Sequence, residues 1–296
     1  MLTGTGTLLD EDQAALRRAA AGNQVLCTIV GLDGSFSRRL GAQLAIDPAS
    51  GSVVGSMADG CLERELATRA AVLHRKGRDE IQRYGKGSPI IDFRLPCGSG
   101  VDILFDPRPD AGALAGAVAR LDRRLPAQIA LPVDRPDLLQ SRAYIPTLRI
   151  LAFGVGPELA ELERLGRAYG IEIVGAGPAS GLVLGQPPVD QPVDPWTAIV
   201  MLFHDHDWER AIVRWALSTP AFYVGAIGGA QVRRSRRAWL QDEGVEAESA
   251  DRLISPVGLI PAARDPRTLA LSVLAEIVSH YEKLRPEPGA GLASAA

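Results

Sequence analysis

The spacing of apolar residues in the first half of the chain predicts a mixture of strands and helices. Short apolar runs indicate strands at 24–31, 41–47, 51–55, 90–95, 101–106 and 127–131. Apolar residues at helical spacing indicate helices at 10–22, 61–76 and 110–124. The second and third strands flank Pro48-Ala49-Ser50, a turn sequence, so we expect these two strands to form a hairpin.

The second half of the chain has a different pattern, in which apolar strands alternate with amphipathic helices. The strands are expected at 147–153, 171–175, 197–203 and 221–225. The helices are expected at 157–169, 207–218, 231–242 and 266–284. This alternation is typical of βαβ units, whose parallel strands form a buried sheet.

Together these patterns predict an α/β protein, with an N-terminal α+β domain followed by a Rossmann-like parallel-sheet domain. A length of 296 residues is enough for two hydrophobic cores. Pro132, Pro136 and Pro146 interrupt the pattern, and we place the domains at 1–140 and 141–285. Residues 286–296 are small and poor in apolar side chains, so we expect a disordered tail.

Composition excludes several classes of protein. A net charge of −3, from 32 basic and 35 acidic residues, argues against a nucleic-acid partner. No apolar run approaches the roughly 18 residues that span a bilayer, and the first residues do not look like a signal peptide. Three cysteines are too few for a disulfide framework, and an odd number favours a reducing compartment. We therefore expect a cytoplasmic protein with no membrane partner.

A glycine turn follows the first strand of the second domain. Gly154 and Gly156 lie between a strand and a helix, where a dinucleotide-binding turn would approach phosphate. Leu159 occupies the place of a third glycine, and the segment 174–178 has no acidic residue to hold the ribose of NAD. These departures weaken ordinary NAD recognition. Another phosphate ligand and a turn that binds no dinucleotide both stay open.

Four polar residues, His204-Asp205-His206-Asp207, follow the third strand of this domain. They stand at the carboxyl edge of the sheet, where α/β proteins bind ligands. Alternate residues on one turn rarely complete a metal site, and the sequence shows no third partner. We favour side chains that face a ligand, and capping of helix 207–218 by Asp205 or Asp207 is the competing interpretation.

The three cysteines have different surroundings. Cys27 lies in an apolar strand and is expected to be a buried small hydrophobe. Cys61 begins a helix, where free backbone N–H groups favour the thiolate, although Asp59 and Glu63 oppose that effect. Cys97 lies in a glycine-rich turn that permits close approach of a ligand. Cys61 and Cys97 could instead form a thiol–disulfide switch.

Two adjacent arginines add a candidate anion site to the first domain. Arg38-Arg39 stand beside Ser35 and Ser37, and this combination of guanidinium and hydroxyl groups suits a phosphate or oxyanion. An arginine pair is commoner as a solvated surface. Three polar, glycine-rich turns in one domain favour an anionic ligand over that simpler interpretation.

A series of motifs runs through nearly the whole chain in a fixed order. In the first half these are GSFSRRLGAQLAI (34–46), GSMADGCLERE (55–65) and LPCGSGVDILFDP (95–107). In the second half they are ILAFGVGPE, MLFHDHDWE, AFYVGAIGG, ISPVGL and LALSVLAEIV. By this ordered series the chain resembles the XdhC/CoxI family, accessory proteins for molybdenum hydroxylases such as xanthine dehydrogenase.

The resemblance implies a first domain that binds molybdenum cofactor and a second domain with a Rossmann fold. In the first domain it implies cofactor-binding roles for Ser37, Arg38, Gly41, Gly60, Cys61, Glu63, Cys97 and Gly98. In the second domain it implies such roles for Gly154, Gly156, His204, Asp205, His206, Gly225 and Gly228. Cys61 and Cys97 are the candidate metal ligands, since thiolates bind molybdenum or sulfur. No catalytic residue is implied.

The function that the resemblance implies is that of a maturation factor rather than an enzyme. Such a factor binds molybdenum cofactor and assists its sulfuration and insertion into a xanthine-dehydrogenase-like molybdenum hydroxylase. Its expected partners are the apo-hydroxylase and a cysteine desulfurase. Two alternatives stay open, a nucleotide-dependent, NAD(P)-type oxidoreductase and a structural scaffold of a hydroxylase complex. The pattern of elements allows a homodimer without requiring one.

Overall fold

The structure is a computed structural model that describes residues 11–57, 60–89 and 98–287, except for the side chains of residues 12 and 61. The chain divides into two compact units between Pro146 and Thr147. We refer to them as the N-terminal and C-terminal domains and describe each by itself.

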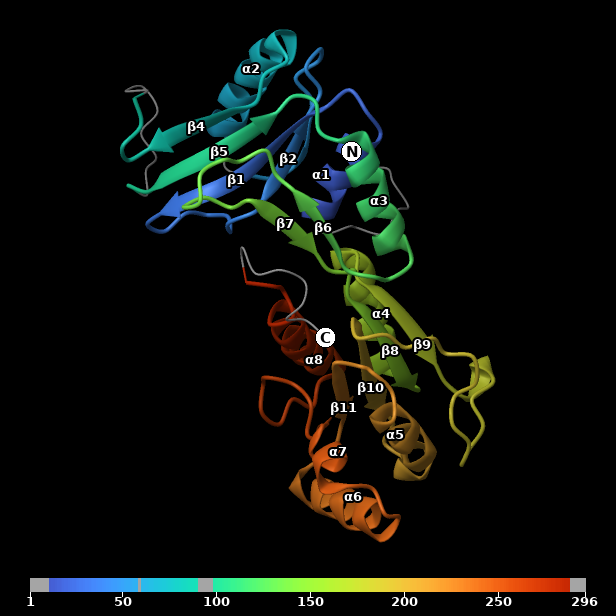
Figure 1. Cartoon of the computed structure of the whole chain (residues 1–296). Coiled ribbons are helices and arrows are strands. Elements are labelled where there is room, and N and C mark those ends of the chain that lie inside the picture. The colour runs from blue at the N-terminus through green and yellow to red at the C-terminus, as the bar shows by residue number, and fades with distance from the viewer. Residues whose placement is uncertain (1–10, 58–59, 90–97, 288–296) are drawn as a thin grey trace. The chain divides into compact units, whose positions relative to one another are not determined.

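The N-terminal domain is built on an antiparallel sheet with the strand order β3-β2-β1-β5-β4 (Figure 1). The strands are β1 (Val25–Asp33), β2 (Gln43–Ile46), β3 (Val53–Gly55), β4 (Glu80–Gly85) and β5 (Gly100–Asp106). Its helices are α1 (Glu11–Ala20), α2 (Gly60–Lys76) and α3 (Ala111–Asp122). A second, two-stranded sheet pairs β6 (Ala127–Ala130) with β7 (Ser141–Tyr144).

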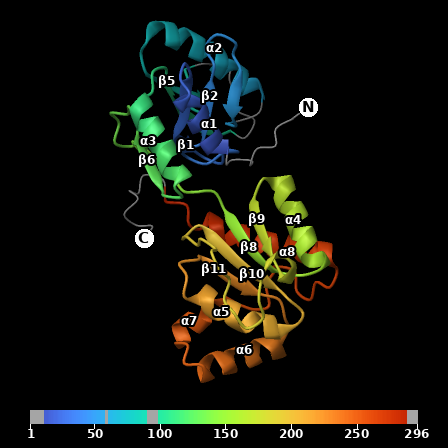
Figure 2. The same ribbon diagram turned by 90° about the vertical axis from the view of Figure 1, so that its right-hand side faces the viewer.

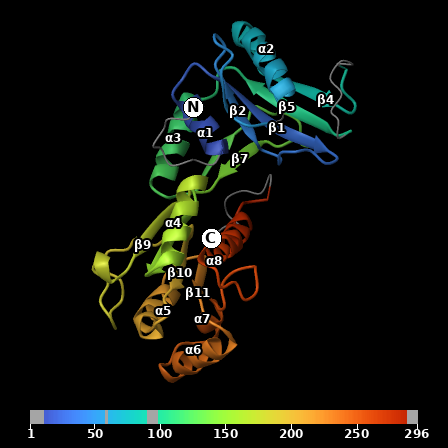
Figure 3. The same ribbon diagram turned by 180° about the vertical axis from the view of Figure 1, so that it is seen from behind.

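Strand β1 is buried on both faces, because its alternate side chains belong to two different hydrophobic clusters. Cys27 and Ile29 pack with apolar side chains of α2. Leu26 and Val30 pack with α1, α3 and the small β6–β7 sheet. Figure 3 shows α2 on one side of the sheet and α1 and α3 on the other. The continuous apolar run in the sequence thus marks a strand between two layers rather than an exposed edge.

The C-terminal domain contains a parallel sheet with the order β12-β11-β10-β8-β9. Its strands are β8 (Arg149–Gly154), β9 (Glu172–Ala176), β10 (Thr197–Leu202), β11 (Tyr223–Ala226) and β12 (Leu253–Ile254). Its helices are α4 (Pro157–Tyr169), α5 (Glu209–Leu217), α6 (Ala230–Asp242), α7 (Ala247–Asp251) and α8 (Pro266–Glu282), with short 3₁₀ turns η1 (Pro178–Ser180) and η2 (His206–Trp208). The strand order changes direction between β8 and β10, which is where Rossmann-like sheets bind ligands.

Helices cover both faces of this parallel sheet. Apolar side chains of α5 and α6 join those of β8, β10 and β11 in one cluster. Helix α4 lies beside α8, and Figure 2 shows α8 behind the sheet and α5 in front of it. The architecture confirms the predicted fold class, an α+β domain followed by a Rossmann-like domain. None of the described helices is both long and apolar enough to cross a lipid bilayer.

Most predicted elements appear near their expected positions, and α4 begins and ends where periodicity placed it. The sequence interpretation missed β4, which pairs with β5, and the predicted strand at 90–95 lies outside the described residues. It also missed β7, α7 and β12. Because β7 pairs with β6, the division of the chain falls after Pro146 rather than at 140.

One glycine in the N-terminal domain tests the packing directly. Gly55 has a φ of +99°, and an added Cβ would lie 2.5 Å from the carbonyl oxygen of Gln43. We expect Gly55→Ala to lower the free energy of unfolding by about 1–3 kcal/mol or more, through strain and overpacking. Urea unfolding followed by circular dichroism measures the change.

Gly116 is the matched control, because it lies inside α3 and an added Cβ would meet nothing within 4 Å. We expect Gly116→Ala to raise the stability by about 0.4–1 kcal/mol. Equal effects of the two substitutions would contradict the described packing around Gly55.

Candidate functional site

The described parts of the three polar turns predicted in the first half lie at the same end of the N-terminal sheet. Strand β1 ends where β5 begins, since Asp33 pairs with Gly100, and β3 ends at Gly55, opposite the start of β2. Residues 34–42, 56–57, 60 and 98–99 therefore follow or precede strands at this one end of the sheet. We call this group of residues the turn cluster.

Arg38 connects two members of the turn cluster. Its guanidinium donates to Ser56 Oγ at 2.5 Å and to the carbonyl oxygen of Ser37 at 3.2 Å. Its Nε atom is buried and has no hydrogen-bond partner among the described residues. A buried N–H group without an acceptor is costly, so the two hydrogen bonds of this guanidinium hold Arg38 in place against that cost.

The start of α2 is held by Glu63. Its Oε1 accepts a hydrogen bond from the backbone N–H of Met57 at 3.1 Å, which joins the first turn of the helix to the segment that precedes it. Cys61 follows Gly60 in this turn, and the structure describes only its backbone. An added Cβ on Gly60 would meet nothing within 4 Å, so the described surroundings leave open space beside the helix start.

The other two predicted glycines of this domain differ in their surroundings. Gly41 has a φ of +82°, and its carbonyl oxygen accepts from Arg142 Nε at 2.6 Å. An added Cβ there would lie 2.9 Å from Arg142 Cδ, so the backbone and packing both require glycine. Gly98 also has a positive φ, +67°, but an added Cβ would meet nothing within 4 Å. Cys97 lies outside the described residues.

A charged network beneath the turn cluster was missed by the sequence interpretation. Arg83 donates to Asp102 Oδ2 at 2.6 Å and to Asp33 Oδ2 at 3.3 Å, and Lys86 Nζ lies 3.3 Å from the same Asp33 oxygen. Asp102 is only 6% exposed. The network connects β1, β4 and β5, and the available signal in the sequence was Asp33 at the end of β1 with Asp102 inside the apolar run of β5.

In the C-terminal domain, the glycine turn after β8 is closely packed. An added Cβ on Gly154 would lie 2.9 Å from Leu202 Cβ, and Gly156 has a φ of +90°. Helix α4 begins at Pro157, directly after this turn, as a helix start with proline often does. The glycines therefore permit both the sharp turn and the close approach of β10.

Glu158 lies in the first turn of α4, and its side chain changes the electrostatics of the glycine turn. The residue is only 8% exposed, and its Oε1 lies 3.2 Å from His204 Nε2. Its Oε2 is buried without a hydrogen-bond partner among the described residues. A helix start is the usual place for a phosphate, and here it already holds a carboxylate. The glycine turn therefore has a buried acidic side chain beside it.

His204 and His206 do not converge on one point. His206 Nδ1 lies 3.1 Å from Glu209 Oε2, while His204 contacts Glu158. Asp205 caps η2 by accepting from the backbone N–H of Asp207 at 3.1 Å, which agrees with the capping interpretation. In the part of the chain that the structure describes, no group of three or more His, Cys, Asp or Glu residues could hold a metal ion.

A buried ion pair lies beside His206, in the turn that follows β10. Arg236 and Glu209 are 2% and 1% exposed, and Arg236 Nε donates to Glu209 Oε2 at 2.9 Å. Arg236 also donates to Ser255 Oγ at 2.7 Å and to the carbonyl oxygen of Ile227 at 2.6 Å. Burial raises the pKa of Glu209, and the charge of Arg236 acts in the opposite direction. The pair ties α5, α6 and the segment after β12 together.

Close packing of neighbouring side chains explains both Gly225 and Gly228. An added Cβ on Gly225 would lie 2.6 Å from Val257 Cγ1. Gly228 has a φ of +134°, and an added Cβ would lie 2.9 Å from Val232 Cγ1. Both positions therefore need glycine whether or not a ligand binds nearby, and their predicted cofactor-binding role stays a prediction.

Comparison with protein families agrees with this two-part architecture. The XdhC and CoxI family model matches residues 18–85, and the XdhC Rossmann domain model matches residues 110–277. The chain belongs to this family. The match to the Rossmann model begins at α3, before the C-terminal domain itself.

Two curated proteins and one solved structure resemble the chain over most of its length. The molybdenum cofactor insertion chaperone PaoD of Escherichia coli K12 is 31% identical over 92% of this chain and 89% of its own. A probable xanthine dehydrogenase subunit of Bacillus subtilis 168 is 22% identical, over 88% and 94% of the two chains. The crystal structure of a Bacillus halodurans protein described as a xanthine dehydrogenase has a TM-score of 0.71 and 18% identity, and covers 97% of this chain and all of its own. At 18% identity, the similarity to this crystal structure shows the fold alone.

The buried ion pair makes a prediction about stability. Glu209→Met leaves the guanidinium of Arg236 buried without its carboxylate, so we expect the free energy of unfolding to fall by about 3–5 kcal/mol. Urea unfolding followed by tryptophan fluorescence measures the change in this domain, because all four tryptophans lie in it, at positions 196, 208, 215 and 239.

The double variant Glu209→Met with Arg236→Met removes both charges and serves as the control. We expect it to be more stable than the single variant, because apolar side chains replace the pair. Additive losses in the double variant would contradict strong coupling between the two residues.

Proposed function

We propose that this protein binds molybdenum cofactor and assists its insertion into a xanthine-dehydrogenase-like molybdenum hydroxylase. The structural observation that carries the proposal is the turn cluster, in which residues 34–42, 56–57, 60 and 98–99 lie at the same end of the sheet. The 31% identical Escherichia coli relative, named as a molybdenum cofactor insertion chaperone, supports the same role across both domains.

The residues of the turn cluster fit an anionic, sulfur-containing cargo. The cofactor is a pterin dithiolene with a phosphate group, and the half-buried guanidinium of Arg38 together with the exposed Ser37 hydroxyl would hold that phosphate. Cys61 and Cys97 would contact molybdenum or its sulfur ligands as thiolates. The open space beside Gly60 and Gly98 would admit the cargo.

The backbone position of Cys61 supports its proposed role. The residue lies in the first turn of α2, a helix of 17 residues, and free backbone N–H groups at a helix start favour a thiolate. We propose that Cys61 acts there as a thiolate ligand.

The proposal also includes two partner proteins. While the cargo is held, its sulfido ligand would be installed by a cysteine desulfurase, and the loaded protein would then meet the apo-hydroxylase. The protein then acts as a maturation factor in the cytoplasm rather than as an enzyme. A homodimer is compatible with this role.

Retention of the cargo tests the proposal. After mixing with isolated molybdenum cofactor and gel filtration, we expect molybdenum and pterin to elute with the wild-type protein. Cys61→Ser and Cys97→Ser should each retain at least ten-fold less, because a hydroxyl is a poor ligand for a soft metal site. Elemental analysis and pterin fluorescence quantify the two components.

Cys27→Ala provides the matched thiol control. Cys27 is fully buried in β1, and burial raises the pKa of its thiol, so it offers no thiolate. We expect this variant to retain the cargo like the wild type. No retention by the wild-type protein would refute the proposal, and full hydroxylase activation by both serine variants would favour a scaffold role.

We further propose that the glycine turn after β8 binds neither NAD nor NADP. The buried carboxylate of Glu158 opposes a pyrophosphate there, and Gly177 and Pro178 follow β9 in place of an acidic residue. Calorimetric titrations with both dinucleotides should be flat. Saturable binding that Gly156→Val abolishes would instead support a nucleotide-dependent oxidoreductase.

A further inference from the structure

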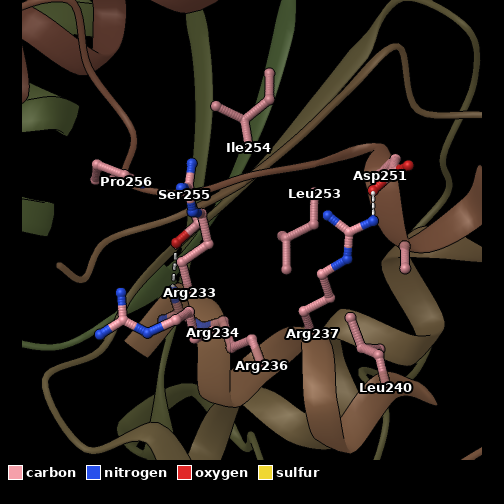
Figure 4. A pocket seen from close by; sticks show the side chains of 11 residues that line it. Arg233, Arg234, Arg236, Arg237, Leu240, Asp251, Leu253, Ile254, Ser255 and Pro256 are labelled. Atoms are coloured by element: carbon pink, nitrogen blue, oxygen red, sulfur yellow. Dashed lines mark hydrogen bonds and ion pairs between the residues drawn. The ribbon is translucent and has the colours of Figure 1, made fainter. Parts of the chain in front are cut away.

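A cavity of about 570 Å³ lies on the C-terminal domain, away from the glycine turn, between α6 and the segment that includes α7 and β12. Figure 4 shows the side chains that surround it. One wall is cationic and consists of Arg233, Arg234, Arg236 and Arg237. The opposite wall is largely apolar and includes Leu253, Ile254 and Pro256. We call this cavity the α6 pocket.

Two of the four arginines have no acidic partner among the described residues. Arg236 is paired with Glu209, and Arg237 Nη2 lies 3.1 Å from Asp251 Oδ1 (Figure 4 shows the second contact). Arg233 and Arg234 are exposed, and neither makes an ion pair within the described part of the chain. The α6 pocket therefore carries an uncompensated positive charge.

The arrangement of these charges is unfavourable for the helix itself. Arg233 lies three and four residues before Arg236 and Arg237, and like charges at this spacing destabilise a helix. Arg233 and Arg234 are also near the N-terminus of α6, where the helix dipole disfavours cations. Its N-cap, Gly229, offers no side-chain acceptor. An anion in the pocket would relieve both repulsions.

The size and lining of the α6 pocket favour a small molecule that has both an anionic group and an apolar part. A volume of about 570 Å³ lies within the usual range for small-molecule sites, roughly 300–1,000 Å³. The guanidinium groups suit phosphate oxygens, while Leu253, Ile254 and Pro256 offer an apolar surface for a ring. Ser255 is already engaged by Arg236, so it helps to position that arginine.

We propose that the α6 pocket binds a small organic phosphate with a planar ring. The phosphate lies against Arg233 and Arg234, and the ring lies against the apolar wall. This site differs from the glycine turn after β8 and from the turn cluster of the other domain. The proposal does not depend on the proposed function, because the same phosphate chemistry comes from a free nucleotide or from the phosphate end of the pterin cofactor.

Calorimetric titration of the full chain at low salt tests this proposal, with cytidine monophosphate and inorganic pyrophosphate as probes. We expect saturable binding of the nucleotide, and at least ten-fold weaker binding by the double variant Arg233→Ala with Arg234→Ala. The variant Arg233→Lys with Arg234→Lys should retain part of the affinity, because charge remains while bidentate geometry is lost. Circular dichroism checks that each variant is folded.

Arg167→Ala is the matched control, because Arg167 is an exposed arginine on α4 in the same domain. It should bind the nucleotide within two-fold of the wild type. No binding of either probe, equal loss in the control, or wild-type affinity in the double alanine variant would overturn the proposal. Binding of oligoglutamate without binding of the nucleotide would also overturn it, in favour of an acidic protein segment.

A competition experiment then distinguishes the two phosphate sources. Displacement of the nucleotide from the wild-type protein by isolated molybdenum cofactor assigns the pocket to the phosphate end of a cofactor molecule, as a second site besides the turn cluster. Nucleotide binding that the cofactor does not displace assigns the pocket to a separate nucleotide. Both results support a phosphate site, and they leave retention by Cys61 and Cys97 as an independent test of the proposed function.

Discussion

The burial of β1 on both faces is the constraint on which the N-terminal domain depends. Because its alternate side chains belong to two hydrophobic clusters, β1 must occupy the middle of the sheet, between β2 and β5. Antiparallel pairing then brings the end of β1, the end of β3 and the start of β5 to the same end of the sheet. The turn cluster, and with it the proposed cargo site, follows from how the core is packed.

The C-terminal domain shows why a Rossmann fold does not by itself indicate a dinucleotide. Its strand order and glycine turn are those of the fold, and our proposal that it binds neither NAD nor NADP rests on Glu158, a buried acidic residue beside that turn. His204 and His206 are engaged by different glutamates, so they form no common site. The uncompensated positive charge of the α6 pocket lies instead at Arg233 and Arg234.

The sequence predicted those features that depend on local periodicity. The regular apolar spacing of α4, ended by Gly170, placed both of its ends correctly. Strand β4 was missed because it reads Glu-Ile-Gln-Arg-Tyr-Gly, and only Tyr84 in it is buried. The pairing of Glu209 with Arg236 joins residues that are distant in the chain, and no periodic pattern encodes such a contact. For the same reason the sequence identified the three turns but did not predict that they lie at the same end of the sheet.

The central claim is the proposal that the thiols of Cys61 and Cys97 hold the molybdenum cargo. X-ray absorption at the molybdenum edge measures the sulfur neighbours of the metal directly. The account predicts more sulfur neighbours in the protein complex than in the free cofactor, and a loss of sulfur in both Cys61→Ser and Cys97→Ser. The same sulfur coordination in the free cofactor, the wild-type complex and both variants would contradict it.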